Sequence, residues 1–167
     1  NNRLTQPTPE VPEELEIQTS TLRLVAKCWG KPEGLPVLAL HGWLDNAATF
    51  DHLAPFLPEF RIVSLDLPGH GFSDHRPSGT SYHFTDMVVD VLEVAEVLKW
   101  DHFSLLGHSM GAGIASYLAG TIPEKIKYLM LIEGLGSIVQ APEKMPENLR
   151  EATNQWLRRS DKKLPLY

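Results

Sequence analysis

The residue type best suited to chemistry is a serine, Ser109, which stands at the centre of the segment Gly107-His108-Ser109-Met110-Gly111. This G-x-S-x-G pattern follows an apolar run at 103–106 and opens a run of small and apolar residues at 110–121. Glycines two positions away on either side allow a tight, strained turn that lifts the hydroxyl out of a sheet. The turn also places the serine at a helix N-terminus, where free N–H groups favour developing negative charge. The pattern therefore predicts a nucleophile, and the alternative is a glycine-rich turn without chemistry.

A second motif, His41-Gly42-Trp43-Leu44-Asp45, directly follows an apolar run at 36–40. Acyl transfer needs two N–H donors aimed at the oxyanion. We expect one donor to be the amide of Met110, the residue after the nucleophile, and the other to be the amide of Trp43. The Trp43 indole could also form a wall of the acyl pocket, or it could simply pack at the base of the loop.

A third motif runs from Asp66 to Asp74 with the sequence DLPGHGFSD. Its two glycines and its proline are typical of a compact turn. We expect Asp66 and Asp74 to hold this turn by hydrogen bonds, and we expect no direct chemical role for His70.

The elements that must position these motifs alternate between strand and helix. Period-two or continuous apolar patterns predict strands at 15–19, 22–29, 36–40, 61–67, 103–106 and 128–132. Amphipathic or small-residue patterns predict helices at 84–99, 110–121 and 147–159. This order predicts an α/β fold, with a mostly parallel sheet and helices on both faces.

Composition narrows the class of protein. The 167 residues are 43% hydrophobic and carry a net charge of −6 without a Lys/Arg stripe, so we expect no nucleic-acid partner. One cysteine, Cys28, excludes an intramolecular disulfide and a zinc cluster of several thiolates, and it fits a reducing, cytoplasmic location. No apolar run approaches the roughly 18 residues of a membrane span. Residues 1–14 are polar and proline-rich, which predicts a flexible tail and no signal peptide.

Together the three motifs resemble those of the α/β-hydrolase superfamily, over residues 15–134. The combination of Trp-Gly, His-Gly-Trp-Leu-Asp-Asn and Gly-His-Ser-Met-Gly is most similar to the serine hydrolase-like proteins. The resemblance implies an α/β-hydrolase core truncated after about six strands, followed at 135–167 by the start of a cap. It also implies a serine, an acid and a histidine in that chain order, with neither metal nor organic cofactor.

The resemblance identifies the nucleophile in this sequence, but it leaves two interpretations for the acid and finds no histidine placed as the base. Glu133 ends the strand after the nucleophile helix, where some family members place the acid; the commoner position follows the next strand. It could instead be a structural carboxylate. In the family the histidine follows the last strand, beyond residue 167, and none of the seven histidines here is placed for that role. His41 and His108 belong to backbone motifs, so we expect the base to come from a C-terminal part.

These observations favour a serine hydrolase that cleaves a carboxylic ester or a similar small acyl substrate through an acyl-enzyme. This segment alone is expected to be inactive, since a serine without its base is a weak nucleophile. The alternatives are a non-catalytic binding module with the same fold and a carbon–carbon bond hydrolase with the same triad. Without further strands, the run at 128–132 would form an exposed apolar edge. We therefore expect a C-terminal half or a second chain to cover it.

Overall fold

A computed structural model of the chain describes residues 11–135 and 141–160. The chain divides into two compact units, Asn1–Ser137 and Ile138–Tyr167. The first unit contains a six-stranded sheet, and the second contains one long helix; each is considered by itself.

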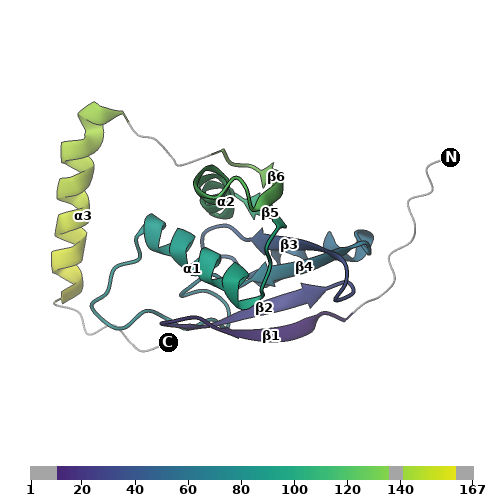
Figure 1. Ribbon diagram of the computed structural model, residues 1–167. Helices are drawn as coiled ribbons and strands as arrows, with labels where there is room; N and C mark the ends of the chain where they lie inside the picture. The colour runs from purple at the N-terminus through teal and green to yellow at the C-terminus, as the bar shows by residue number, and fades with distance from the viewer. Residues whose placement is uncertain (1–10, 136–140, 161–167) are drawn as a thin grey trace. The chain divides into compact units, whose positions relative to one another are not determined.

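The sheet of the first unit has the strand order β1-β2-β4-β3-β5-β6 (Figure 1). Strands β4, β3, β5 and β6 run parallel to one another, whereas β2 is antiparallel to both β1 and β4. This confirms the predicted α/β fold with a mostly parallel sheet of six strands. The strands are β1 Glu13–Gln18, β2 Arg23–Trp29, β3 Leu35–Leu40, β4 Phe60–Leu65, β5 Phe103–His108 and β6 Ile126–Ile132.

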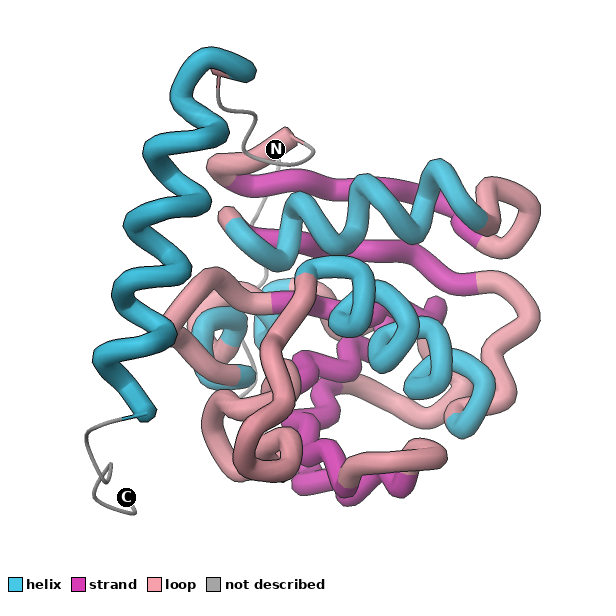
Figure 2. Tube along the Cα trace, turned by 90° about the vertical axis from the view of Figure 1, so that its left-hand side faces the viewer, coloured by secondary structure: helices cyan, strands magenta, loops and turns pink. Residues whose placement is uncertain are grey.

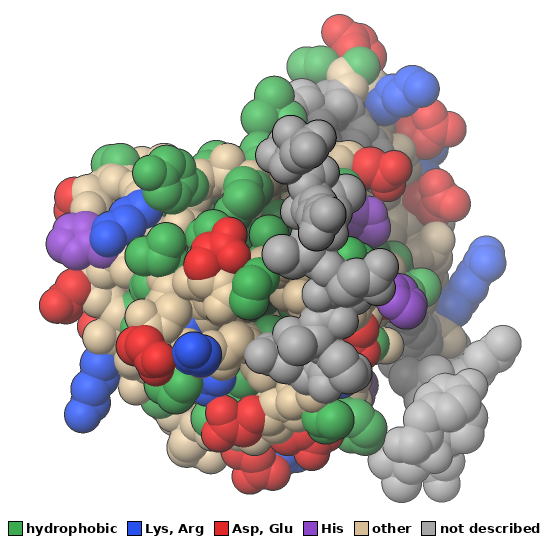
Figure 3. Space-filling view, turned by 90° about the vertical axis from the view of Figure 1, so that its right-hand side faces the viewer, with side chains coloured by type: hydrophobic (Ala, Val, Ile, Leu, Met, Phe, Trp, Pro, Cys, Tyr) green, Lys and Arg blue, Asp and Glu red, His purple; other side chains and the backbone are tan. Residues whose placement is uncertain are grey.

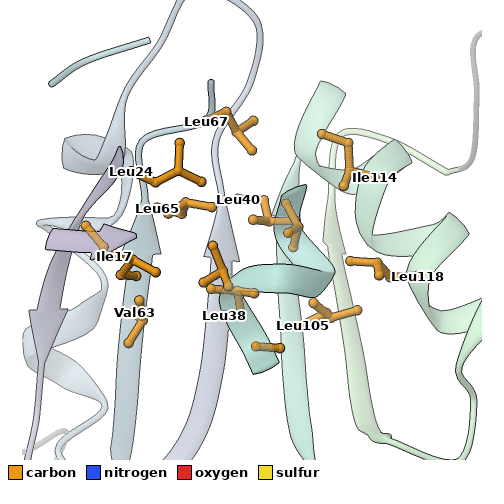
Figure 4. Packing of buried hydrophobic residues seen from close by; sticks show 14 of the residues in the cluster. Ile17, Leu24, Leu38, Leu40, Val63, Leu65, Leu67, Leu105, Ile114 and Leu118 are labelled. Carbon is orange, nitrogen blue, oxygen red and sulfur yellow. The ribbon is translucent and has the colours of Figure 1, made fainter. Parts of the chain in front are cut away.

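The two long helices of this unit are α1, Phe84–Val97, and α2, Met110–Thr121, and both pack on the same face of the sheet (Figure 2). Figure 4 shows how Ile114 and Leu118 of α2 meet the strand residues Leu38, Leu40 and Leu105. The opposite face is covered by two 3₁₀ helices, η1 Ala47–Phe50 and η2 Ala54–Phe56. Helices thus cover both faces, but those on the second face are single short turns.

Strand β1 begins earlier than predicted. Glu13 and Glu14 fall within the predicted tail, yet they pair with Cys28 and Lys27 of β2 and so extend the ladder. Residues 1–10 of the predicted tail lie outside the described residues.

The far edge of the sheet is β6, which pairs with β5 on one side. Four of its large side chains are exposed: Tyr128 to 68%, and Leu129, Met130 and Ile132 to about 40% each. Among the described residues, nothing pairs with its outer edge, which agrees with the prediction of an exposed apolar edge.

The second unit contains η3, Pro142–Lys144, and α3, Met145–Ser160. The helix is close to the predicted range of 147–159. The exposed Met145 and Leu149 lie on it, 67% accessible each. The assignment of 135–167 to a cap stays a prediction, and its residues 136–140 and 161–167 lie outside the described ones.

No helix within residues 11–135 or 141–160 is both long and apolar enough to cross a membrane. On the face drawn in Figure 3, acidic and basic side chains are interspersed with exposed hydrophobic ones.

Candidate active site

Ser109 occupies the turn between β5 and α2, as the sequence predicted. Its backbone has φ 52° and ψ −112°, a conformation that L-residues rarely adopt, and the residue is exposed. Its N–H donates to the carbonyl of Ile132 at 2.9 Å, and its carbonyl accepts from the amide of Ala112 at 3.0 Å. The turn is therefore fixed by the backbone on both sides, and the serine side chain is accessible rather than packed in the core.

The glycines on either side of Ser109 are required by close backbone contacts. A Cβ added at Gly107 would lie 2.5 Å from the carbonyl oxygen of Gly111. A Cβ at Gly111 would lie 2.2 Å from the carbonyl oxygen of Leu40, at the end of β3. These approaches confirm the steric reason for the G-x-S-x-G pattern, because no side chain larger than hydrogen fits between α2 and the strands.

The loop after β3 lies directly against the serine. A Cβ on Gly42 would lie 3.3 Å from Cβ of Ser109 and 3.2 Å from Nδ1 of His108. Trp43 follows, and its side chain is 62% exposed, so it does not pack into the base of the loop. Met110 is the first residue of α2, where an amide has no acceptor within its own helix. Among the described residues, the amides of Trp43 and Met110 take part in none of the backbone hydrogen bonds of the loops and helix caps.

His41 supports the base of this loop from the core. Its ring is fully buried, with Nδ1 2.7 Å from the carbonyl of Gly42 and Nε2 accepting from the amide of Leu67 at 3.0 Å. Because an amide can only donate, Nε2 carries the lone pair and Nδ1 the proton. Burial lowers the pKa of His41 below its ordinary value, with a further lowering from the neighbouring His70. His41 is therefore a neutral structural group, as its place in a backbone motif predicted.

Asp66 and Asp74 tie the third motif as expected. The buried Asp66 carboxylate accepts from the amide of Ala47 at 2.6 Å and from the amide of Phe72 at 2.8 Å, and so joins two loops. Asp74 accepts from the amide of Arg23 at 2.9 Å. The sequence predicted a turn held by these carboxylates, but not that Asp66 bridges to the loop beside Ser109. Only the fold brings Ala47 and Phe72 together, since 25 positions separate them in the chain.

Glu133 lies at the end of β6, beside the serine turn, with φ 52°. Its Oε2 is 3.3 Å from Nε2 of His108, and its side chain is 79% exposed. A Cβ added at the next residue, Gly134, would lie 2.9 Å from the carbonyl oxygen of Ser109. The geometry places a carboxylate next to the serine turn, where either an acid or a structural partner of His108 fits.

No histidine of the described residues hydrogen-bonds to the Ser109 hydroxyl. His108 faces Glu133, and its Nδ1 is buried without a hydrogen-bond partner. The same part of the chain holds no group of three or more His, Cys, Asp or Glu side chains arranged to bind a metal ion. The site therefore brings together a serine turn, two unused amides and a carboxylate.

This fold and this serine turn define a class. The chain belongs to the α/β-hydrolase family: the family model described as alpha/beta hydrolase fold matches residues 36–163.

The chain is similar to serine hydrolase-like proteins. It is 47% identical over 128 residues to one from Dictyostelium discoideum, covering 74% of this chain and 36% of that protein. It is 41% identical over 126 residues to the human serine hydrolase-like protein, covering 75% of this chain and 62% of that one. The chain thus spans between about a third and two thirds of the length of these two relatives.

Solved structures show the same fold. A hypothetical protein from Pseudomonas aeruginosa has a TM-score of 0.85 at 50% identity, covering 93% of this chain and 55% of that one. A thioesterase domain from the curacin biosynthetic pathway has a TM-score of 0.77 at 30% identity, covering 95% of this chain and 57% of that one.

Proposed function

We propose that this chain is the nucleophile-bearing part of a serine hydrolase that cleaves a carboxylic ester or a similar acyl substrate through an acyl-enzyme. The observation that carries the proposal is the exposed Ser109 in a strained turn at the N-terminus of α2, next to the loop of Gly42 and Trp43. Its enzyme class is an esterase-type hydrolase, and its substrate is a small acyl compound. The name of the related thioesterase domain supports acyl transfer for this fold.

The first step joins Ser109 Oγ to the acyl carbon. The hydroxyl proton passes to a base histidine as the bond forms, and the carbonyl oxygen takes up the negative charge. The amides of Trp43 and Met110 donate to that oxygen, which stabilises the charge most as it develops. Collapse of the intermediate breaks the bond to the alkoxide or thiolate, which leaves with the proton from the histidine, and water then releases the acid by the same route.

We propose that the base histidine comes from a C-terminal part beyond these residues and that Glu133 orients it. In support, Glu133 ends β6 beside the serine turn, and its carboxylate is largely exposed. The competing role of Glu133 is structural, through His108 at 3.3 Å. Replacing Glu133 by Gln in the native protein separates the two roles. Loss of activity with an unchanged fold and stability agrees with an orienting acid, and retained activity with lowered stability would assign Glu133 to His108.

We further propose that the same C-terminal part, or a second chain, covers the outer edge of β6. The exposed apolar side chains of Tyr128 and Ile132 support this, because an open apolar edge recruits another strand. The buried single Cys28 supports action in the reducing cytoplasm. The net charge of −6 supports the absence of a nucleic-acid partner.

One observation favours a second function, a binding module that retains the pocket without turnover. Within the described residues the Ser109 hydroxyl has no histidine partner. Such a module would bind acyl compounds but would not form a covalent intermediate.

A fluorophosphonate distinguishes the two functions, since it reacts with an activated serine. The native protein, with any C-terminal part, is treated with the reagent and analysed by peptide mass spectrometry. We expect an adduct on Ser109 that is lost in Ser109→Ala and kept in Ser20→Ala, a change at another exposed serine. Absence of an adduct on Ser109 would overturn the enzyme proposal and favour the binding module.

A further inference from the structure

A second histidine, His70, contacts the loop that carries Trp43. Its Nε2 is 3.4 Å from the amide nitrogen of Leu44, and its Nδ1 is 3.1 Å from the carbonyl oxygen of Pro68. An amide can only donate and a carbonyl can only accept, so the geometry selects the neutral ring with its proton on Nδ1. His70 is thus a hydrogen-bond acceptor for the residue next to the proposed oxyanion donor.

The ring of His70 is also wedged between two aromatic groups. It meets His41 edge to face with centroids 5.1 Å apart, and it meets the Trp43 indole in the same way at 5.7 Å. The three rings connect the buried base of the loop to its exposed tip. His70 therefore contacts both the Trp43 indole and the amide of the next residue, Leu44.

The contact between His70 and Leu44 matters because of the backbone conformation of Leu44. Its φ is 59°, in the left-handed region that costs a non-glycine residue roughly 1 kcal/mol or more. A conformation of this kind persists only where its surroundings hold it. The hydrogen bond from the Leu44 amide to His70 is formed by the strained residue itself. The Trp43 amide belongs to the adjacent peptide, so its orientation depends on the same stretch of backbone.

We propose that His70 is a positioning residue that holds the Trp43 amide toward the oxyanion only while its ring is neutral. This inference rests on the proposed function for the role of that amide. Protonation at Nε2 removes the lone pair that accepts from the Leu44 amide. The N–H of the ring then faces the N–H of Leu44, and the two repel each other. The loop is then released from the left-handed conformation at Leu44, and the Trp43 amide loses its orientation.

Charged and titratable groups of the neighbouring loops surround this pair, and they act on the pKa of His41 in opposite directions: His70 lowers it, and Asp66 and Asp45 raise it. His41 faces His70 directly, and Asp66 and Asp45 lie close enough to act on His41. The Asp66 carboxylate is engaged by two amides, and Asp45 accepts from the amide of Asn46. Burial lowers the pKa of His41, which keeps that ring neutral.

The direct test is an NMR titration that does not depend on activity. The ring signals of His70 and the amide signals of Trp43 and Leu44 are followed as the pH is lowered. We expect a ring protonated on Nδ1 at high pH, and amide shifts with the same midpoint as the ring. His70→Phe keeps a ring but no acceptor and should abolish the amide transition; His75→Phe, at an exposed histidine of the same turn, should keep it.

An amide of Leu44 that stays unchanged through the titration of the His70 ring would overturn the proposal, as would a ring protonated on Nε2. In the native protein, His70→Phe should lower kcat about tenfold with little change in KM, because a displaced oxyanion donor affects the transition state. The substitution should also remove the fall in kcat at low pH that the proposal attributes to this ring. Failure of Ser109 to react in any form would reject the proposed function, while the NMR result would still decide the role of His70.

Discussion

At the scale of single residues, Ser109 combines backbone strain with exposure. Its φ of 52° and ψ of −112° are held by the bond from its amide to Ile132 and by the start of α2. Strain of this kind costs of order 1–3 kcal/mol and persists where the surrounding structure enforces it. The position of the hydroxyl is thereby set by the backbone and not by side-chain packing.

This strain predicts the effect of removing the Cβ atom. Ser109→Gly should be about 1 kcal/mol more stable than Ser109→Ala, because glycine accepts positive φ at no steric cost. Urea denaturation of the two variants measures the difference. Equal stability, or a more stable alanine variant, would show that the turn is not strained.

A second prediction at this scale concerns Cys28. Burial raises the pKa of its thiol to about 11, so the reactive thiolate is scarce at pH 8. We expect no reaction with a disulfide reagent in the native protein and stoichiometric reaction in urea. Rapid labelling of the folded protein would contradict the buried position of this side chain at 2% exposure.

At the scale of elements, the serine turn depends on how closely α2 approaches the strands. Gly111→Ala should destabilise the protein by about 3 kcal/mol or more, since its Cβ would lie 2.2 Å from the backbone oxygen of Leu40. Gly120→Ala, in the last turn of the same helix, meets nothing within 4 Å and should stabilise it by about 0.5–1 kcal/mol. Thermal unfolding of both variants provides the comparison, and similar effects would argue against close packing at Gly111.

Most of these elements could be predicted from apolar patterns. Helix α2 matches its predicted range of 110–121, and β2 and β3 differ from theirs by one residue at the start. The patterns did not show that Glu13 and Glu14 are in a strand, because pairing with β2 decides this rather than side-chain type. They also did not show that both long helices share one face, which depends on the order of strands in the sheet.

The sequence predicted only the part of the candidate site that lies within one local motif. The segment from Gly107 to Gly111 predicted the serine turn, because its glycine spacing is a local pattern, although the contact that requires Gly111 is with the distant Leu40. The contact of His70 with Leu44 and the bridge of Asp66 between Ala47 and Phe72 join segments far apart in the chain. No local pattern encodes such contacts.

At the scale of the whole molecule, pH should affect stability through His41. Its pKa is lower in the folded state than the ordinary 6.5, so the unfolded chain binds more protons just below that pH. The contribution of the neutral ring is fully present above pH 6.5 and is lost as the pH falls through the folded pKa. NMR of the His41 ring together with urea unfolding at several pH values tests this; a ring that titrates above 6.5 would contradict it.

The open edge of β6 predicts self-association of this 167-residue chain. Tyr128→Lys should reduce it, because a charge on an exposed strand edge opposes pairing with another chain. Val89→Lys, at an exposed position on α1, is the matched control and should leave association unchanged. Sedimentation equilibrium measures both, and equal effects would place the contact elsewhere.

The central claim is that Ser109 is a nucleophile whose oxyanion is held by two amides. The most direct measurement is a crystal structure of the native protein after reaction with a fluorophosphonate. We expect phosphorus bonded to Ser109 Oγ, with its oxygen roughly 2.7–3.1 Å from the amide nitrogens of Trp43 and Met110. An adduct on another residue, or a phosphonyl oxygen turned away from both amides, would contradict the account.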